Sequence, residues 1–586
     1  MFKGLKFFIS EGWKYDKKYV IWVFLYQIVN SMIPVVGALM PKFVIDELMG
    51  EKRINVLVGY VLGFALYAFV SNAFSNYLFW DEFSHRINVS SGSLLNLYRN
   101  LGYADYEKLE DPAFLEMKTK ARKFLFCADH GYGYLLTKAA SIIGQVFTLA
   151  GLIAILSTMN IWFVVLFSVL AVLCSVIDGR ATKKAMELMM KAHKVERMYS
   201  YFNNLFQEMQ WAKEIRLHGL QEWLLGTYRK NDEFGNSCYK QANDCYIRSG
   251  IGRGFLAFIQ QCAAYAFLIA KVLGGGMGVG SFTMCIGAVT SFGEALRQII
   301  QSLNEIKVYD LYYDDLDEYL NMPAKLREGK KLPADEREHT FEFRNVSFRY
   351  AGSEVWALKN VNLTIERGQR LSLVGENGSG KSSFIKLLCR LYDPTEGVIL
   401  MDGVDIRDFD YDQYLAQFST VFQDFSLFDF SLRENLAFDG RASDERIMEA
   451  IRQVGIEQRV NTLPNGLDTH VGRTFDENGF EPSGGEAQKI ALARALIKEA
   501  PVVILDEPTA AMDARAEYEL YRNFSELTGG KTAIYISHRM SSSRFCDKVA
   551  VLENGSLTEY GTHDELMTLG GQYAELYAMQ AQYYTD

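Results

Sequence analysis

The sequence predicts a multi-domain fold, in which an all-α transmembrane domain with six helices precedes an α/β P-loop domain. Long uncharged apolar stretches fill the first half, although the formal net charge of all 586 residues is −10. The second half carries a phosphate-loop motif between an apolar run and a helical pattern. We place the transmembrane domain at 1–320, a polar linker with two prolines at 321–340, and the nucleotide-binding domain at 341–586.

Six stretches of the first half are long and apolar enough to cross a bilayer, which takes about 20 residues of a helix. They are Val20–Ala38, Ile54–Trp80, Ala139–Met159, Ile161–Ile177, Gly254–Ala270 and Ser281–Ile300. Gln27, Asn30 and Pro34 interrupt the first stretch. We therefore expect that helix to face other helices or a cavity.

Basic residues are distributed unevenly between the connecting segments. The long segments 81–132 and 178–253 hold seven and thirteen Lys and Arg, whereas 157–160 holds none and 271–280 holds one. Basic loops mark the cytoplasmic side of a membrane. We therefore expect a multi-pass protein of the cytoplasmic membrane, embedded in the lipid bilayer, with both termini and the nucleotide-binding domain in the cytoplasm.

The two long segments have helical patterns, and each contains a turn, at Tyr103–Met117 and at Gln207–Gln221. We expect these turns to contact the nucleotide-binding domain. Inside the sixth span, Glu294 and Arg297 are three residues apart, and ionisable residues at that depth face a cavity or pair with each other. Two interpretations stay open for them: a substrate or gating contact, and a mutual salt bridge near the inner membrane edge.

The segment Leu371–Cys389 contains the run Gly375-Glu-Asn-Gly-Ser-Gly-Lys381-Ser382, which is a complete P-loop motif. The glycines allow successive backbone N–H groups to surround an anion, and the following helix adds its positive N-terminal dipole. We expect Lys381 to reach the β- and γ-phosphates and the Ser382 hydroxyl to bind Mg²⁺. A simple glycine turn is the alternative, and the full motif between a strand and a helix argues against it.

Two adjacent acids end the apolar run Val502–Asp506, which is typical of a central parallel strand. We expect Asp506 to hold Mg²⁺ through water, and Glu507 to orient and deprotonate the attacking water. Phosphoryl transfer needs mainly positioning and charge neutralisation, and these side chains supply both. Two acids after a strand are a weak signal alone, but together with the P-loop they predict ATP hydrolysis.

The segment Glu477–Ala495 reads ENGFEPSGGEAQKIALARA, and its core Ser483-Gly484-Gly485 resembles the signature motif of the ABC transporters. Further matches to this family follow the order of its motifs. Tyr350 matches the aromatic loop that stacks on adenine, Gln423 the Q-loop, Asp513 the D-loop and His538 the switch histidine. Six spans fused ahead of one ATPase domain resemble an exporter-type half-transporter, and the resemblance covers essentially the whole chain.

The resemblance implies ATP and Mg²⁺ as cofactors, with Glu507 and His538 as catalytic residues. The residues that it implies for ATP binding are Tyr350, Gly375, Asn377, Gly378, Ser379, Gly380, Lys381, Ser382, Ser383, Gln423, Ser483, Gly484, Gly485, Glu486 and Asp513. Those that it implies for Mg²⁺ are Ser382, Gln423 and Asp506. In this family the P-loop of one chain faces the signature of another, so a second half-transporter is the implied partner. We expect a homodimer, with one half of a heterodimer as the alternative.

Two residues depart from the family's signature pattern: Pro482 stands where the family usually has leucine, and Glu486 where it usually has glutamine. The γ-phosphate contacts implied for Ser483 and the two glycines remain. An added acid near a triphosphate repels it unless the acid is neutralised. We therefore expect a usable signature, with altered affinity as the alternative.

The combination of spans and motifs predicts ATP-driven export, because an importer usually keeps its membrane and ATPase subunits on separate chains. A soluble ABC ATPase lacks the six spans, and the acidic net charge argues against a nucleic-acid partner. Three segments resemble those of lantibiotic-type exporters: Ala212–Gly219, Phe422–Phe425 and Ala487–Arg494. We therefore expect a peptide substrate. A multidrug exporter of small molecules and a lipid exporter fit the same chain, and an ATP-gated channel is a rarer alternative.

Overall fold

The computed structural model of the chain describes residues 2–126, 131–157, 161–207, 211–334, 338–507, 530–537 and 540–582. They belong to two compact units. The helical unit comprises Met1–Gly102 and Pro112–Met322, and the α/β unit comprises Tyr103–Asp111 and Pro323–Asp586. The short segment Tyr103–Asp111 therefore belongs to the α/β unit, although in the sequence it lies between two parts of the helical unit.

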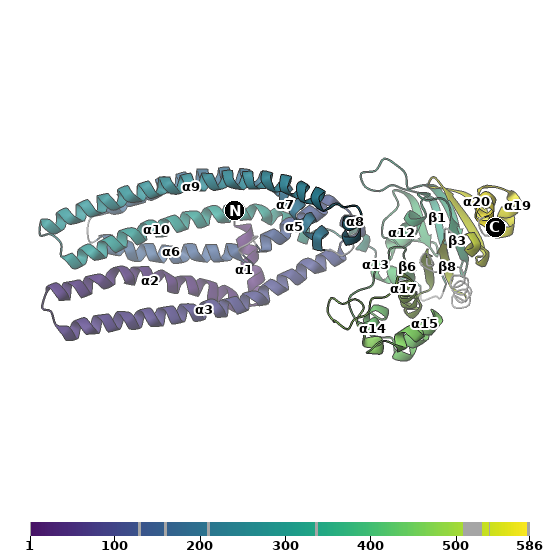
Figure 1. Ribbon diagram of the computed structural model, residues 1–586, viewed down its shortest axis with the longest axis horizontal. Coiled ribbons are helices and arrows are strands. Elements are labelled where there is room, and N and C mark those ends of the chain that lie inside the picture. Colours follow the sequence, from purple (N-terminus) through teal and green to yellow (C-terminus); the bar gives the residue numbers. More distant parts are fainter. Residues whose placement is uncertain are drawn as a thin grey trace. The chain divides into compact units, whose positions relative to one another are not determined.

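The helical unit is drawn in purple to teal in Figure 1. Its helices are α1 (Lys3–Tyr15), α2 (Lys17–Met49), α3 (Ile54–Tyr103), α5 (Pro112–Phe126), α6 (Tyr134–Ser157), α7 (Ile161–Gln207), α8 (Ala212–Leu217), α9 (Gln221–Leu273), α10 (Val279–Tyr309) and α11 (Tyr313–Leu320). Each of the six predicted spans falls on one of these helices, apart from 158–159, which lie outside the described residues.

Within the described part of the chain, five helices are long and apolar enough to cross a membrane. Four of them are α2, α3, α6 and α9, and the fifth begins with α10 at Val279. The predicted span Ile161–Ile177 forms the start of α7, a helix of 47 residues. Many side chains of this stretch lie outside the described residues, so the sixth span stays a prediction.

A side chain and a backbone carbonyl of α2 accept hydrogen bonds from neighbouring helices. The Ser75 hydroxyl of α3 donates to Asn30 Oδ1 of α2 at 2.9 Å, and the Thr148 hydroxyl of α6 donates to the Ser31 carbonyl oxygen of α2 at 2.9 Å. Helix α6 packs against both α2 and α10, and the three helices run alongside one another in Figure 1. Interhelical hydrogen bonds of this kind are how polar residues are accommodated at membrane depth. The expectation that the first span faces other helices is thus met.

The α/β unit contains two sheets. Its strands are β1 (Phe341–Phe348), β2 (Leu358–Ile365), β3 (Arg370–Val374), β4 (Glu396–Met401), β5 (Val404–Asp405), β6 (Phe418–Val421), β7 (Val502–Asp506), β8 (Thr532–Ile536), β9 (Lys548–Glu553) and β10 (Ser556–Gly561). The smaller sheet is antiparallel and has the order β2-β1-β4-β5. The larger sheet has the order β10-β9-β3-β8-β7-β6, and all of its pairs except β9–β10 are parallel.

Every residue of β7 and β8 is buried, as expected for the central strands of a parallel sheet that is covered on both faces. The helices of this unit are α4 (Tyr106–Leu109), α12 (Lys381–Leu388), α13 (Tyr411–Ala416), α14 (Leu432–Leu436), α15 (Asp444–Gln453), α16 (Glu457–Asn461), α17 (Gly484–Lys498), α19 (His563–Leu569) and α20 (Gln572–Gln582). The described residues of this unit form three buried apolar clusters, two of them large. One large cluster lies between α12 and the two sheets. The other lies between helices α14–α17 and strands β6, β7 and β8.

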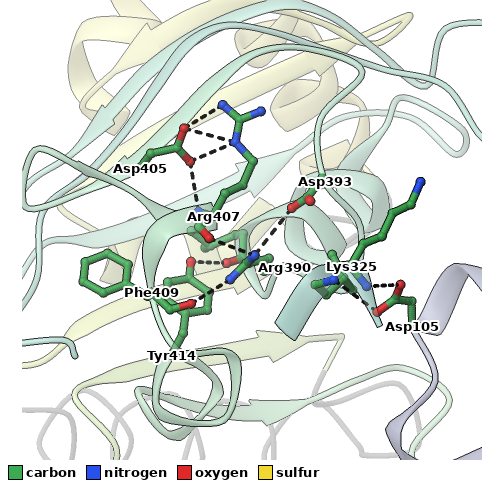
Figure 2. A network of polar contacts seen from close by, with 10 residues as sticks. Asp105, Lys325, Arg390, Asp393, Asp405, Arg407, Phe409 and Tyr414 are labelled. Atoms are coloured by element: carbon green, nitrogen blue, oxygen red, sulfur yellow. Dashed lines mark hydrogen bonds and ion pairs between the residues drawn. The ribbon is translucent and has the colours of Figure 1, made fainter. Parts of the chain in front are cut away.

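A buried arginine fixes the end of α12 (Figure 2). Arg390 is 1% exposed, and its guanidinium donates to the carbonyl oxygens of Phe409 at 3.1 Å and Arg407 at 3.2 Å. The Tyr414 hydroxyl donates to the Leu388 carbonyl oxygen at 2.6 Å. A buried charge is tolerated when its donors are satisfied. Here the partners are backbone carbonyls of the loop that follows β5 and, at 3.5 Å, the carboxylate of Asp393. The end of the helix is thereby attached to that loop.

Two carboxylates attach the segment Tyr103–Asp111 to the rest of the α/β unit by hydrogen bonds. The carboxylate of Asp105 accepts from the backbone N–H groups of Lys325 at 2.9 Å and Leu326 at 3.2 Å, and the first of these is drawn in Figure 2. Glu110 accepts a hydrogen bond from the Tyr392 hydroxyl. The prediction that the turn in Tyr103–Met117 contacts the nucleotide-binding domain is therefore confirmed for Tyr103–Asp111. The second predicted turn contains α8 in the helical unit, and its contact stays a prediction.

Candidate nucleotide site

The P-loop connects β3 to α12 and has the tight backbone that its glycines predict. Gly375 and Gly380 have φ angles of 150° and 106°. A Cβ atom on Gly375 would lie 2.2 Å from the Leu552 carbonyl oxygen, and one on Gly380 would lie 2.6 Å from that of Ala357. Glycine is therefore required at both positions. Because α12 begins at Lys381, its unpaired N–H groups and the positive end of its dipole lie at the loop.

Lys381 is held inside this loop. The residue is 6% exposed, and its ammonium donates to the carbonyl oxygens of Gly375 at 2.8 Å and Glu376 at 2.9 Å. Burial lowers the pKa of Lys381, and the nearby carboxylates of Glu507 and Asp506 partly oppose this change. The cation is thus already positioned by the backbone, before any phosphate contributes.

The other predicted P-loop residues differ in exposure. Ser379 Oγ is buried and has no hydrogen-bond partner among the described residues, so it is a polar atom that a phosphate oxygen would satisfy. Asn377, Gly378 and Ser382 are exposed. The buried Ser383 hydroxyl is instead hydrogen-bonded to the Tyr350 hydroxyl at 2.9 Å.

Asp506 is the last residue of β7 and is 6% exposed. Burial, together with the charge of Glu507, raises the pKa of Asp506 to about 6, and Lys381 opposes the shift. A raised carboxyl pKa means that the surroundings stabilise the negatively charged carboxylate less well than water does. A hard divalent cation with oxygen ligands, such as Mg²⁺, would supply the missing charge.

Glu507 adopts an unusual backbone conformation, with a φ angle of 50°. A non-glycine residue in this region is strained, and such strain is kept where surrounding contacts impose it. The Glu507 N–H donates to the Ile536 carbonyl oxygen at 2.9 Å, and the Gln488 amide donates to the Glu507 carbonyl oxygen at 3.1 Å. Gln423 donates to the Glu507 carboxylate at 3.0 Å. The predicted base is therefore oriented by the residue that was predicted to bind Mg²⁺.

The signature residues form the beginning of α17. Ser483 is the N-cap residue, and Glu486 completes a capping box with it. The Ser483 N–H and hydroxyl donate to the Glu486 carboxylate at 2.8 and 2.9 Å. The backbone N–H groups of Gly484 and Gly485 fall in the first turn of the helix, where such groups have no intrahelical acceptor. The start of α17 is thus suited to bind an anion.

The unusual Glu486 is neutralised. Arg459 of α16 lies 3.0 Å from its carboxylate. The hydrogen bond from the Ser483 backbone is the main favourable cause that lowers the pKa of Glu486, and Arg459 lowers this pKa further. The condition under which an added acid is compatible with a triphosphate is therefore met. Sequence reasoning missed Arg459, because it lies on a different helix.

Tyr350 packs against two aromatic side chains. Its ring centre lies 4.9 Å from that of Phe348 and 5.4 Å from that of Tyr392. The ammonium of Lys386 lies 5.5 Å from the centre of the Tyr350 ring. Sequence reasoning also missed Lys386 and Tyr392. The spacing of Lys386 from the P-loop lysine on the same short helix is the only signal that could have indicated it.

The residues present fit ATP and Mg²⁺ through the glycine loop, the Ser379 hydroxyl and the under-compensated Asp506. The structure brings Lys381, Asp506, Glu507 and Gln423 together at the carboxyl ends of β3 and β7. Two predicted residues, Asp513 and His538, lie outside the described residues. Their roles stay predictions.

Residues 358–510 match the family model described as ABC transporter. The subtilin transport ATP-binding protein SpaT of Bacillus subtilis is 29% identical over 92% of this chain and 88% of its own length. The nisin transport ATP-binding protein NisT of Lactococcus lactis is 28% identical over 96% of this chain and 94% of its own. The ATP-dependent lipid A-core flippase of Salmonella typhimurium is 34% identical over 64% of each chain.

The fold has a match among solved structures. The structure of a bacterial Atm1-family ABC exporter with ATP bound superposes with a TM-score of 0.79 at 22% identity, over 96% of this chain and 98% of that chain. At this identity the likeness concerns the fold. It extends over the helical unit as well as the α/β unit, because it covers almost the whole of both chains.

Proposed function

The chain belongs to the ABC transporters, as an exporter-type half-transporter, and we propose that the substrate it exports is a peptide. Its ATPase domain couples ATP hydrolysis to transport across the membrane in which its helices are embedded. The observation that carries the peptide proposal is the similarity to SpaT and NisT, which extends over 92% and 96% of this chain and thus includes the membrane helices. Membrane helices contain the substrate path of a transporter.

A lipid is the second candidate substrate. The lipid A-core flippase is more similar to this chain in percentage identity, at 34%, but over only 64% of it. The flippase match leaves more than a third of this chain unmatched, whereas the matches to SpaT and NisT cover almost all of it, so they say more about the membrane helices. Peptide export is therefore the better supported function.

The residues of the proposed ATP site have separate roles. Lys381 and the P-loop N–H groups bind the phosphates, and Asp506, Ser382 and Gln423 hold Mg²⁺, which neutralises phosphate charge when it is bound. Glu507 accepts the proton of the attacking water, and its hydrogen bond to Gln423 orients the carboxylate. Tyr350 stacks on the adenine. His538 and Asp513 complete the site as the family pattern implies.

Two copies of this chain form the transporter in this proposal. Each copy has a P-loop with Glu507 and a signature at Ser483–Gly485, so two copies contain the parts of two complete sites. Closed two-fold dimers are the commonest oligomers. Expression of the chain alone tests this: a stable dimer with ATPase activity supports the homodimer, and activity that needs a second, different half-transporter contradicts it.

We further propose that the protein lies in the cytoplasmic membrane with both termini and the ATPase domain inside. Single cysteines in a background without the native ones test this orientation. A cysteine at Lys14 should resist a membrane-impermeant thiol reagent in intact cells, and one at Gly276 should react. The reverse labelling would contradict the orientation.

Transport in proteoliposomes tests the proposed substrate. Vesicles that contain the purified chain should accumulate a fluorescent peptide when ATP is added outside, and vesicles with the Glu507→Gln variant should not. Fluorescent phosphatidylethanolamine and rhodamine 123 serve as the lipid and cation probes in parallel. If the peptide is not accumulated and the lipid probe moves, the protein is a lipid exporter. If the peptide is not accumulated and rhodamine 123 moves, it is a multidrug exporter.

A further inference from the structure

A cavity of about 310 Å³ lies within the helical unit, between α7, α9 and α10. This volume is at the lower end of the range of ligand pockets. Four of its lining residues carry charge: Asp178 of α7, Arg253 of α9, and Glu294 and Arg297 of α10. The charges of these residues sum to zero. The cavity therefore presents both an anion and a cation, without a net field of either sign.

The four residues form two ion pairs with different structural consequences. Arg253 Nε lies 3.0 Å from Asp178 Oδ1, and this pair joins α9 to α7. Arg297 binds Glu294 through two hydrogen bonds, with its Nε at 2.9 Å, and both residues belong to α10. The first pair therefore has a role in helix packing. The hydrogen bonds of the second pair connect two neighbouring turns of one helix, and its charges also interact with those of Arg253 and Asp178.

The hydrogen bonds of the Glu294–Arg297 pair lie within α10 and do not join it to another helix. A pair three residues apart stabilises a helix by far less than it costs to keep two charges at membrane depth. The side chains are also accessible, at 50% exposed for Glu294 and 33% for Arg297. Ionisable residues in spans that face a cavity usually belong to the substrate path. The mutual salt bridge expected from the sequence is therefore present, and both residues also line a cavity.

The remaining lining indicates the chemistry of the ligand. Gln260 and Gln261 of α9 and Thr290 of α10 add amide and hydroxyl groups. Gly293 leaves room for the Gln260 amide, because a Cβ atom there would lie 3.3 Å from Gln260 Nε2. None of the lining residues that the structure describes is aromatic. A hydrophobic cation is typically recognised by aromatic faces, which the described lining lacks. The donors and acceptors lie beside the apolar side chains of Ala257, Val289 and Ile300, and this mixture suits a peptide better than an acyl chain, which has no use for polar partners.

We propose that this cavity binds a short extended segment of the exported peptide, with Glu294 receiving a basic group and Arg297 an acidic group of that segment. The inference rests on the proposed peptide function. Binding exchanges the mutual ion pair for two new ones, so that no charge is left unpaired at membrane depth. The amides of Gln260 and Gln261 then bind the peptide backbone, which offers one donor and one acceptor at each residue.

Binding of four synthetic peptides tests the assignment. They are fluorescent hexapeptides with blocked ends that contain one Lys and one Glu, only Lys, only Glu, or neither. Anisotropy measures their affinity for the full chain in lipid nanodiscs. The wild type should bind the peptide with both Lys and Glu more tightly than the neutral one, because only this peptide replaces both partners of the Glu294–Arg297 pair. Glu294→Gln should weaken binding of the Lys peptide by about tenfold, and Arg297→Gln should weaken binding of the Glu peptide by about as much. This is the effect of losing one charge-assisted contact.

The selectivity of these losses separates a ligand role from a structural one. A variant that has only lost packing would weaken all four peptides equally, including the neutral one, and this result would overturn the assignment, as would unchanged affinities. Arg53→Gln is the matched control, because it breaks the Arg53–Glu47 pair of the same unit, which lies outside the cavity. It should leave all four affinities unchanged.

The same experiment distinguishes failure of the cavity assignment from failure of the proposed function. If the wild type binds the peptides but the two variants show no charge-specific loss, the cavity assignment is wrong and peptide export stands. If the wild type binds none of the four peptides and binds fluorescent phosphatidylethanolamine or rhodamine 123 instead, peptide export is wrong, and the assignment falls with it.

Discussion

The ammonium group of Lys386 lies 5.5 Å from the centre of the Tyr350 ring and 3.6 Å from the Glu110 carboxylate. The rings of Tyr106 and Tyr392 are at similar distances from this ammonium, 5.7 and 5.6 Å. Lys386 therefore connects the residue predicted to stack on adenine with the α4 segment, which continues in the sequence into the membrane helices.

Replacement of Lys386 by methionine should loosen α4, because it removes the charge and keeps most of the apolar side chain. A cation–π interaction at a partly exposed site stabilises by about 0.5–1 kcal/mol. Amide hydrogen exchange within 106–110 should therefore accelerate by about 2- to 5-fold for the lost contact with Tyr106, the one of the three rings that belongs to α4. Lys359→Met, at an exposed position on β2 of the same unit, is the control. Equal exchange in both variants would contradict the connection.

Glu507→Gln should retain ATP binding and lose turnover. The amide keeps the size and hydrogen-bonding capacity of the side chain beside Gln423 but cannot accept the proton of water. Removal of a positioned base typically reduces turnover by about 10²–10⁴. ATPase assays and nucleotide binding on the purified protein measure the two effects separately. Glu553→Gln, at the exposed end of β9, controls for loss of an acid, and near-wild-type turnover in Glu507→Gln would exclude this residue as the base.

Asp506 should make the stability of the nucleotide-free protein depend on pH. Its pKa in the folded chain is about 6 and its ordinary value is 3.8, so the folded state binds the proton more tightly than the unfolded state. The stabilisation is complete below about pH 3.8 and is lost as the pH rises through about 6, with a total of roughly 3 kcal/mol. Thermal unfolding between pH 5 and 7.5 should show this loss in the wild type.

The Asp506→Asn variant should lack that part of the pH dependence, because its side chain does not titrate. Mg²⁺ binds the ionised carboxylate of Asp506, so protonation of this residue opposes Mg²⁺ binding. The Mg²⁺-dependent gain in ATP affinity should therefore be smaller at pH 5 than at pH 7 in the wild type. An identical pH dependence of unfolding in Asp506→Asn and the wild type would contradict the role of burial.

Arg459→Gln should weaken ATP binding at the signature by exposing the charge of Glu486. The pair is partly exposed, so the effect should be modest, about 2- to 5-fold in affinity for an ion pair of about 0.2–1 kcal/mol. Glu486→Gln in the same chain should restore the affinity, because glutamine preserves the capping box without the charge. Independent effects of the two substitutions, with no rescue, would show that Arg459 does not act through Glu486.

The sequence was sufficient for those parts of the site that are contiguous in it. The P-loop and the acids after β7 are local motifs, and the structure gives each the backbone that its residue types require. Arg459 could not be predicted, because it reaches Glu486 only through the packing of α16 near the start of α17. Lys386 likewise acquires its surroundings from Tyr106 in the distant first half of the chain.

The same distinction applies to the fold. Apolar length alone predicted where the membrane helices lie, because the bilayer fixes that length. The four-residue helix α4 is too short for any periodic signal, and its attachment depends on single interactions such as that of Asp105 with the backbone of Lys325. The orientation of Glu507 by Gln423 also depends on the approach of two separate strand ends, which no local pattern encodes.

The attachment of Tyr103–Asp111 to the α/β unit has a consequence for synthesis of the chain. Ribosomes add about 5–20 residues each second, so Tyr392 is made roughly 15–55 s after its partner Glu110. During that interval the aromatic face of α4 has no partner from its own unit. Folding of the two units is therefore coupled in time, and a fragment that starts at Pro323 lacks a piece of its own surface. Such a fragment should aggregate more readily than one supplied with 103–111 as a separate peptide.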